Sequence, residues 1–221
     1  MNEKIKISDL FERAPDMIHP LFAECRFPWE VLDKLCVFLE CVISSRPEGF
    51  LEYSPGVLIG EGVEIEEGAK ILPPTVISKN AKIRKDAYVR GSVFIGEGAV
   101  VGHATEVKNS VMMDHAEAPH FNYVGDSILG KRAHIGAGVI LSNLKSDKPA
   151  VVIHADRDYH TGRRKLGAIL GDHAEIGCNS VLNPGSIIGK AATVYPLTSF
   201  RGVLPEGYIA KSQGIIVKKD K

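Results

Sequence analysis

The fold is decided by residues 59–111, IGEGVEIEEGAKILPPTVISKNAKIRKDAYVRGSVFIGEGAVVGHATEVKNSV. An aliphatic residue recurs there at every sixth position: Ile59, Ile65, Ile71, Ile77, Ile83, Val89, Ile95, Val101 and Val107. A small or β-branched residue follows four positions after each. A helix repeats its apolar face every 3.6 residues and a half-buried strand every two, so neither alone gives a period of six. Hexapeptide repeats are typical of a β-helix with three short faces per coil. The sequence therefore predicts an all-β solenoid.

Composition narrows the classes of function. The chain has 221 residues, and 27 basic side chains balance 27 acidic ones, so net charge favours neither nucleic acid nor a membrane surface as partner. The four cysteines form no C-x-x-C pair, and the sequence contains no long apolar run or signal peptide. We expect a soluble, reduced, cytoplasmic protein.

The hexads divide the chain into three parts. Residues 1–54 carry no hexad, and from Phe27 to Arg46 apolar residues recur at helical spacings of three and four. Because an open solenoid exposes an apolar end, we expect this part to be a helical N-terminal cap. The β-helix is expected over 55–200, and 201–221 as a C-terminal tail.

The six-residue rhythm falters after Val107. Met113 keeps the phase, but Glu117 occupies the small-residue position that follows it. The rhythm resumes at Leu129 and breaks again over 144–167, which we expect to leave the coil as an extended loop or hairpin. Departures from a regular pattern are where function is expected.

Two cations occupy equivalent positions one coil apart. Arg90 follows Val89, and Lys108 follows Val107 eighteen residues later. Strands stacked about 4.8 Å apart bring such charges together, so an anion between them is favourable, and a phosphate suits an Arg fork beside a Lys. Solvated surface charges beside Glu66 or Asp86 are an equally consistent interpretation.

A histidine marks the point where the repeat breaks. It is His120, and a histidine side chain has the chemistry of a general base, although a single histidine is more often a loop or packing residue. His115 and His120 also have the spacing of two metal ligands, but a zinc site needs a third protein ligand. Metal is therefore the minority interpretation.

A basic run lies in the segment 144–167. Arg163, Arg164 and Lys165 are consecutive and have the charge needed to hold cofactor phosphates, although such runs are commonly solvated.

These residues resemble a known family. The hexads resemble those of the hexapeptide acyltransferases. Three further motifs resemble the acetyltransferase domain of bifunctional UDP-N-acetylglucosamine synthesis enzymes and of sugar-1-phosphate nucleotidylyltransferase/amino-sugar-1-phosphate acetyltransferases: His120-Phe121-Asn122-Tyr123-Val124-Gly125-Asp126, Ile135-Gly136-Ala137-Gly138 and Ser142-Asn143-Leu144. The resemblance covers roughly residues 55–200.

The resemblance implies a left-handed parallel β-helix that forms a homotrimer and transfers acetyl from acetyl-CoA to an amino-sugar-1-phosphate. It implies the following roles: general base for His120, oxyanion donor for the amide of Ala137, phosphate binding for Arg90 and Lys108, amino-sugar contact for Tyr123 and Asn143, and acetyl-CoA binding for Cys178, Arg163 and Arg164.

The chain departs from the family pattern in two ways. No uridylyl-transfer motif precedes Phe27, so a separate nucleotidyltransferase is a further expected partner, and His134 stands where one branch has a substrate-contacting Asn. Two alternatives stay open: a non-catalytic sugar-phosphate-binding paralogue or partner of a nucleotidyltransferase, and a metal enzyme of the γ-carbonic-anhydrase type.

Overall fold

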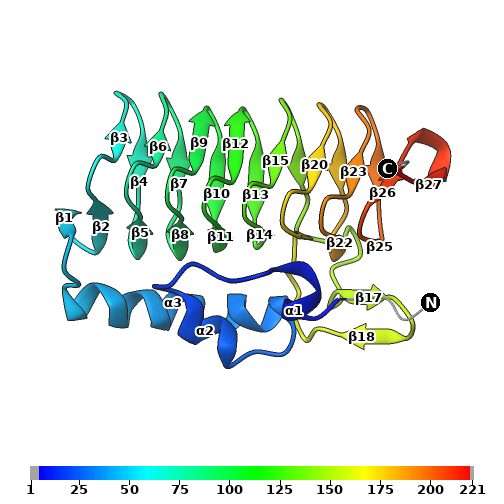
Figure 1. Cartoon of the computed structure of the whole chain (residues 1–221), viewed down its shortest axis with the longest axis horizontal. Coiled ribbons are helices and arrows are strands. Elements are labelled where there is room, and N and C mark those ends of the chain that lie inside the picture. The colour runs from blue at the N-terminus through cyan, green and yellow to red at the C-terminus, as the bar shows by residue number, and fades with distance from the viewer. Residues whose placement is uncertain (1–4, 220–221) are drawn as a thin grey trace.

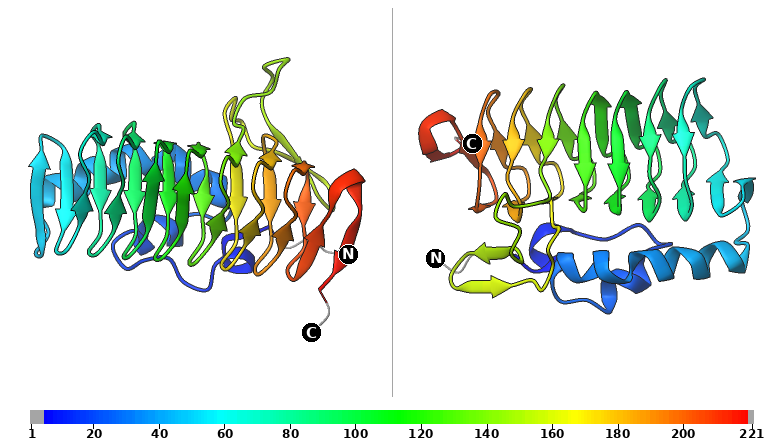
Figure 2. Two further views of the ribbon diagram at one scale, coloured as in Figure 1. Left: turned by 90° about the horizontal axis from the view of Figure 1, so that it is seen from above. Right: turned by 180° about the vertical axis from the view of Figure 1, so that it is seen from behind.

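The computed structural model describes residues 5–219, most of which form a left-handed parallel β-helix with three sheets (Figures 1 and 2). Sheet A contains β1(Phe50–Ser54), β2(Val57–Gly60), β5(Thr75–Ile77), β8(Val93–Ile95), β11(Ser110–Met112), β14(Ile128–Leu129), β19(Ala168–Leu170), β22(Ser186–Ile188) and β25(Val203–Leu204). Sheet B contains β3(Glu64–Ile65), β6(Lys82–Ile83), β9(Val100–His103), β12(Glu117–His120), β15(His134–Ile135), β20(Glu175–Ile176), β23(Thr193–Val194), β26(Tyr208–Ala210) and β27(Ile216–Lys218). Sheet C contains β4(Lys70–Ile71), β7(Tyr88–Val89), β10(Glu106–Lys108), β13(Tyr123–Gly125), β16(Ile140–Leu141), β21(Val181–Leu182) and β24(Ser199–Phe200). The β-helix expected from the hexads is confirmed.

The interior is a single apolar core built from the hexad residues. The aliphatic residues of the three sheets stack coil upon coil, and from Ile77 onward they are buried, as Val89, Ile95 and Val101 illustrate. Those of the first coil, Ile59, Ile65 and Ile71, are half-buried. Their smaller companions, such as Ala81, Ala87 and Ala99, are buried beside them. Short strands with a corner after each therefore explain the period of six.

The corner between sheets C and A varies in length, whereas the other two are constant. From a core residue of sheet A to that of sheet B, and from B to C, the step is always six residues. From sheet C to sheet A it is six after Val89, five after Val107, five after Val124 and 29 after Leu141. The rhythm therefore fails only at this C–A corner.

The shorter corner after Val107 corrects one sequence prediction. Met112, not Met113, pairs with Ile95 and lies in the core, and Ala116 occupies the small-residue position that we had assigned to Glu117. Losing one residue at the corner moves every later core residue by one position.

The helices α1(Ile7–Leu10), α2(His19–Ala23) and α3(Pro28–Ser45) lie along the side of the β-helix (Figure 1). Outward residues of sheet A, among them Val76 and Phe94, are large and apolar, and they form one buried cluster with Leu35 and Leu39 of α3. The expected position over the open end is wrong, since β1 pairs antiparallel with β2 at that edge. The helices instead cover the apolar outer face of sheet A.

Residues 144–167 leave the coil at the C–A corner and return to it (Figure 2). They include an antiparallel hairpin of β17(Val152–His154) and β18(Asp158–His160), and Leu144 and Lys165 form a bridge at its base. The ring of Tyr159 packs edge-on against those of Phe27 and Trp29. The hairpin thus packs against the helical layer, by which we mean α1, α2 and α3 together.

The β-helix continues beyond the boundary expected at residue 200. Strands β25 and β26 add to sheets A and B, and after η1(Ser212–Gly214) strand β27 pairs antiparallel with β26. Within residues 5–219, no helix has the length and apolar character needed to cross a membrane.

Candidate active site

Three predicted site residues stack at the corner between sheets B and C. The amide of Gly138 donates to the carbonyl of His120 (3.1 Å), and the amide of Asn179 donates to the carbonyl of Ala137 (2.8 Å). His120, Ala137 and Cys178 therefore occupy consecutive coils of one corner, and His120 and Cys178 are exposed there. The structure brings together the candidate base, oxyanion donor and cofactor contact.

The turn that presents His120 is held by a buried asparagine. Asn122 is only 3% exposed. Its Nδ2 donates to the carbonyl of Gly136 (2.7 Å), and its Oδ1 accepts from the amide of His120 (3.1 Å). Phe121 takes a positive φ of 38° between them. This fixed turn leaves the His120 imidazole facing solvent.

The amide of Ala137 is available as a donor. Ala137 is half-buried, and among the described residues no acceptor forms a hydrogen bond with its N–H. Its carbonyl, by contrast, is engaged by the next coil. A free backbone N–H one coil from a histidine can stabilise a developing oxyanion.

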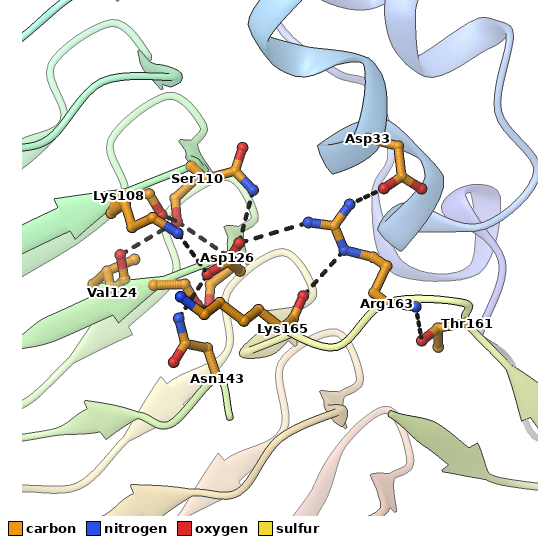
Figure 3. A network of polar contacts seen from close by, with 12 residues as sticks. Asp33, Lys108, Ser110, Val124, Asp126, Asn143, Thr161, Arg163 and Lys165 are labelled. Carbon is orange, nitrogen blue, oxygen red and sulfur yellow. Dashed lines mark hydrogen bonds and ion pairs between the residues drawn. The ribbon is translucent and has the colours of Figure 1, made fainter. Parts of the chain in front are cut away.

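The C–A corner holds a second polar group, centred on Asp126 (Figure 3). Asp126 is 3% exposed. Its Oδ2 accepts from Asn143 (2.6 Å) and Lys108 (3.2 Å), and its Oδ1 accepts from Asn109 (2.8 Å). A buried carboxylate requires such partners. Sequence reasoning missed this role because Gly125-Asp126 reads as an ordinary turn.

Tyr123 reaches along sheet C to this group. Its hydroxyl accepts from Nδ2 of Asn143 (3.1 Å). A Cβ at Gly125 would lie 2.5 Å from that hydroxyl, so the glycine leaves room for the ring. Burial, with Glu106 and Asp126 nearby, raises the pKa of Tyr123. The phenol therefore stays protonated and can donate a hydrogen bond.

Arg90 and Lys108 lie in adjacent coils, as their spacing predicted, since β7 and β10 pair in register. Each has its own carboxylate: Arg90 donates to Glu106 (2.7 Å), and Lys108 donates to Asp126. These partners differ from the Glu66 and Asp86 considered from the sequence. The repulsion between the cations is thus relieved without a ligand.

The two candidate arginines have different surroundings. The side chain of Arg163 is 12% exposed, and its guanidinium pairs with Asp33 of α3 and with Asp126 (3.6 Å). Arg164 is exposed. Only Arg164 of this pair is turned to solvent.

The two histidines considered as metal ligands lie apart. His115 sits at the corner before β12, where its ring packs over Gly98, and His120 ends that strand. Across residues 5–219, no three His, Cys, Asp or Glu side chains gather in a way that could hold a metal ion.

The two candidate groups, His120 with Ala137 and Cys178 at the B–C corner and the residues around Asp126 at the C–A corner, occupy successive corners of the coil. Tyr123 lies on the strand between them, because β13 begins after His120 and ends before Asp126. His120 and Asp126 are six residues apart in the sequence, so their Cα atoms lie within about 20 Å of each other, the length of six extended residues.

A family model described as the GMPPB C-terminal domain matches residues 71–214. A bifunctional sugar-1-phosphate nucleotidylyltransferase/acetyltransferase of Sulfurisphaera tokodaii is 40% identical over 97 residues, which are 43% of this chain and 24% of that protein. The bifunctional protein GlmU of Methanococcus maripaludis strain C7 is 46% identical over 170 residues, 76% of this chain and 41% of that protein. The chain spans less than half the length of these curated relatives.

Among solved structures, the acetyltransferase domain of PglB from Neisseria gonorrhoeae is 13% identical, with a TM-score of 0.36. The match covers 80% of this chain and 63% of that one.

Proposed function

Because the chain belongs to the family of the GMPPB C-terminal domain, we propose that it transfers an acetyl group from acetyl-CoA to the amine of an amino-sugar-1-phosphate. The observation that carries this proposal is the exposed His120 beside the unpaired amide of Ala137 in the next coil. A general base and an oxyanion donor are the two groups that acyl transfer from a thioester to an amine requires.

In the proposed reaction, His120 removes a proton from the amine as its nitrogen attacks the thioester carbonyl. The new C–N bond produces a tetrahedral oxyanion, which the Ala137 amide stabilises. The C–S bond then breaks, and the proton passes to the departing CoA thiolate. The products are an N-acetylated sugar phosphate and free CoA thiol.

The C–A corner is the proposed site for the sugar phosphate. The Lys108 ammonium has three N–H donors, and Asp126 uses one of them, which leaves two for phosphate oxygens. Arg90 in the adjacent coil adds a planar fork. The Tyr123 hydroxyl and the Asn143 amide are the proposed contacts of the sugar, for which glucosamine-1-phosphate is the first candidate.

Acetyl-CoA is proposed to lie along the B–C corner. Cys178 occupies the coil after Ala137, where it is exposed. Arg164 is exposed in the segment at the C–A corner, so it would meet a CoA phosphate held at the B–C corner of a neighbouring copy. The guanidinium of Arg163 already has two carboxylate partners.

A homotrimer is the proposed assembly, because the two groups lie at different corners of one chain and a neighbouring copy would bring one beside the other. The exposed Phe121 and Leu197 lie on the B–C corner and would be covered in such a contact. Sedimentation at micromolar concentration should show a trimer, and a stable monomer would count against a shared site.

The function is tested by measuring CoA thiol release with acetyl-CoA and either glucosamine-1-phosphate or galactosamine-1-phosphate. Free glucosamine and N-acetylglucosamine-1-phosphate are the controls for the phosphate and the amine. Turnover that depends on both groups supports the proposal. Binding of the sugar phosphate without thiol release would identify a non-catalytic binder instead, and a stoichiometric bound metal would favour the carbonic-anhydrase alternative.

A further inference from the structure

Arg163 joins three parts of the chain that are distant in sequence (Figure 3). It belongs to the segment 144–167, yet its guanidinium pairs with Asp33 of α3 on one side and with Asp126 of the C–A corner on the other. Its Nε also donates to the carbonyl of Lys165 (3.2 Å). With its side chain only 12% exposed, Arg163 is a fixed connection rather than a mobile surface cation.

Asp126 links Arg163 to residues that we assign to the sugar phosphate. The carboxylate oxygen that pairs with Arg163 also accepts from Asn109, and its other oxygen accepts from Asn143 and Lys108. A carboxylate accepts hydrogen bonds but donates none. Its position therefore sets the direction of the Asn143 amide and of the Lys108 ammonium.

The returning chain is pressed against the same corner. The amide of Gly167 donates to the carbonyl of Asp126 (2.8 Å), and the amide of Leu166 donates to the carbonyl of Asn143 (3.0 Å). A Cβ at Gly167 would lie 2.2 Å from the carbonyl oxygen of Gly125, so no side chain fits there. A shift of the segment would therefore move Asp126 and Asn143 together.

We propose that Asp33, Arg163 and Asp126 form a positioning relay through which helix α3 and the segment 144–167 fix Asn143 and Lys108 for the sugar phosphate. The effect on substrate binding rests on the proposed function, whereas the contacts by which Arg163 holds the segment 144–167 in place do not. Arg163 and Asp126 are positioning residues in this scheme, and Asp33 is the anchor on the helical layer.

The relay predicts a graded effect on one substrate only. Arg163→Gln should raise the KM for glucosamine-1-phosphate about tenfold, because it removes both the ion pair with the buried Asp126 carboxylate and the charge-assisted hydrogen bond to Asp33. Asp33→Asn should raise it about two- to fivefold, since that carboxylate is 56% exposed. Asp33→Glu keeps the charge and should restore a near wild-type value. The KM for acetyl-CoA should not change in any of the three.

Glu40→Gln is the matched control. Glu40 is an exposed carboxylate on α3, two helical turns beyond Asp33, and among residues 5–219 its side chain forms a hydrogen bond only with the Cys36 thiol. It should behave as wild type in every measurement.

The second readout needs no substrate. Hydrogen exchange of the Leu166 and Gly167 amides, followed in peptides of the intact protein, should accelerate in Arg163→Gln and Asp33→Asn but not in Glu40→Gln. If Asp33→Asn matches Glu40→Gln in exchange, the relay is wrong. A rise in the KM for acetyl-CoA instead of the sugar phosphate would also overturn it and would make Arg163 a cofactor ligand. Accelerated exchange in a protein without turnover would refute the proposed function alone and support the relay.

Discussion

Lys108→Met is a sharp test of the C–A corner, because it removes the ammonium and keeps an apolar stem of similar length. The ammonium donates to Asp126, whose side chain is 4% exposed, and hydrogen bonds to charged groups contribute about 1.5–3 kcal/mol. Lys108 itself is 26% exposed, and Asp126 keeps its contacts with Asn109, Asn143 and Arg163. We therefore expect the free energy of unfolding to fall by about 1.5–2 kcal/mol, at the lower end of that range.

Arg90→Met is the matched variant in the neighbouring coil. The Arg90–Glu106 pair lies at the surface, with side chains 41% and 32% exposed, so this change should leave stability close to wild type. Both variants lose a proposed phosphate ligand. Both should therefore raise the KM for glucosamine-1-phosphate roughly tenfold or more while leaving the KM for acetyl-CoA unchanged.

The assay pairs urea denaturation, followed by circular dichroism at one fixed protein concentration, with initial rates of thiol release. A fixed concentration matters because the stability of an oligomer depends on it. If Lys108→Met and Arg90→Met have equal free energies of unfolding, the contact of Lys108 with the buried Asp126 does not stabilise the fold as expected. Wild-type KM values in both would show that no phosphate binds between Arg90 and Lys108.

Three further predictions concern other parts of the site and the layer that supports it. His120→Ala should lower the rate of thiol release about 10²–10⁴-fold while retaining sugar-phosphate binding; His115→Ala should matter far less, and equal losses would contradict the assignment of His120 as base. Gly125→Ala should displace the Tyr123 ring, because the new Cβ would lie 2.5 Å from its hydroxyl; a raised KM for the sugar phosphate with an unchanged melting temperature is expected, and a wild-type KM would argue against Tyr123 as a ligand. Asp172 lies between β19 and β20, where its buried carboxylate accepts hydrogen bonds from the amides of Glu12 and Lys131. Burial raises the pKa of Asp172, so its stabilising contribution is present below the ordinary carboxyl value of about 4 and is lost as pH rises through the raised pKa. The free energy of unfolding of Asp172→Asn should change less with pH over this range than that of wild type, and an identical pH profile would contradict this prediction.

The sequence predicted the coil well, because the hexads record an inward side chain at every step. It predicted the helical layer less well, since counting inward positions ignores Phe94 and Val76, whose apolar side chains face outward. These residues decide that α3 covers sheet A rather than the end of the solenoid. The frame error at Met113 has a related cause: a one-residue deletion at a corner is invisible until strand register is known.

The sequence named candidate site residues one by one, but it did not indicate how they are connected. Motif resemblance pointed to His120 and Ala137, and the structure places them in consecutive coils. No local pattern marks Asp126, because its partners Asn109, Asn143 and Arg163 lie 17 to 37 positions away and meet only through the stacking of coils. For the same reason, nothing in the basic run 163–165 indicates that the Arg163 side chain is largely buried while that of Arg164 is exposed.

The unequal corners have a consequence for how this molecule can change. The A–B and B–C corners keep a constant step of six residues. The strands of sheet B and the core beneath them therefore keep their register whatever the length of the C–A corner. At the C–A corner the step is five residues after Val107 and Val124 and 29 after Leu141, yet Leu170 still stacks on Leu129. Loop length at that corner is thus decoupled from the hydrophobic stack. New ligand contacts can be inserted or trimmed there by evolution or by design, with the rest of the solenoid serving as an unchanging frame.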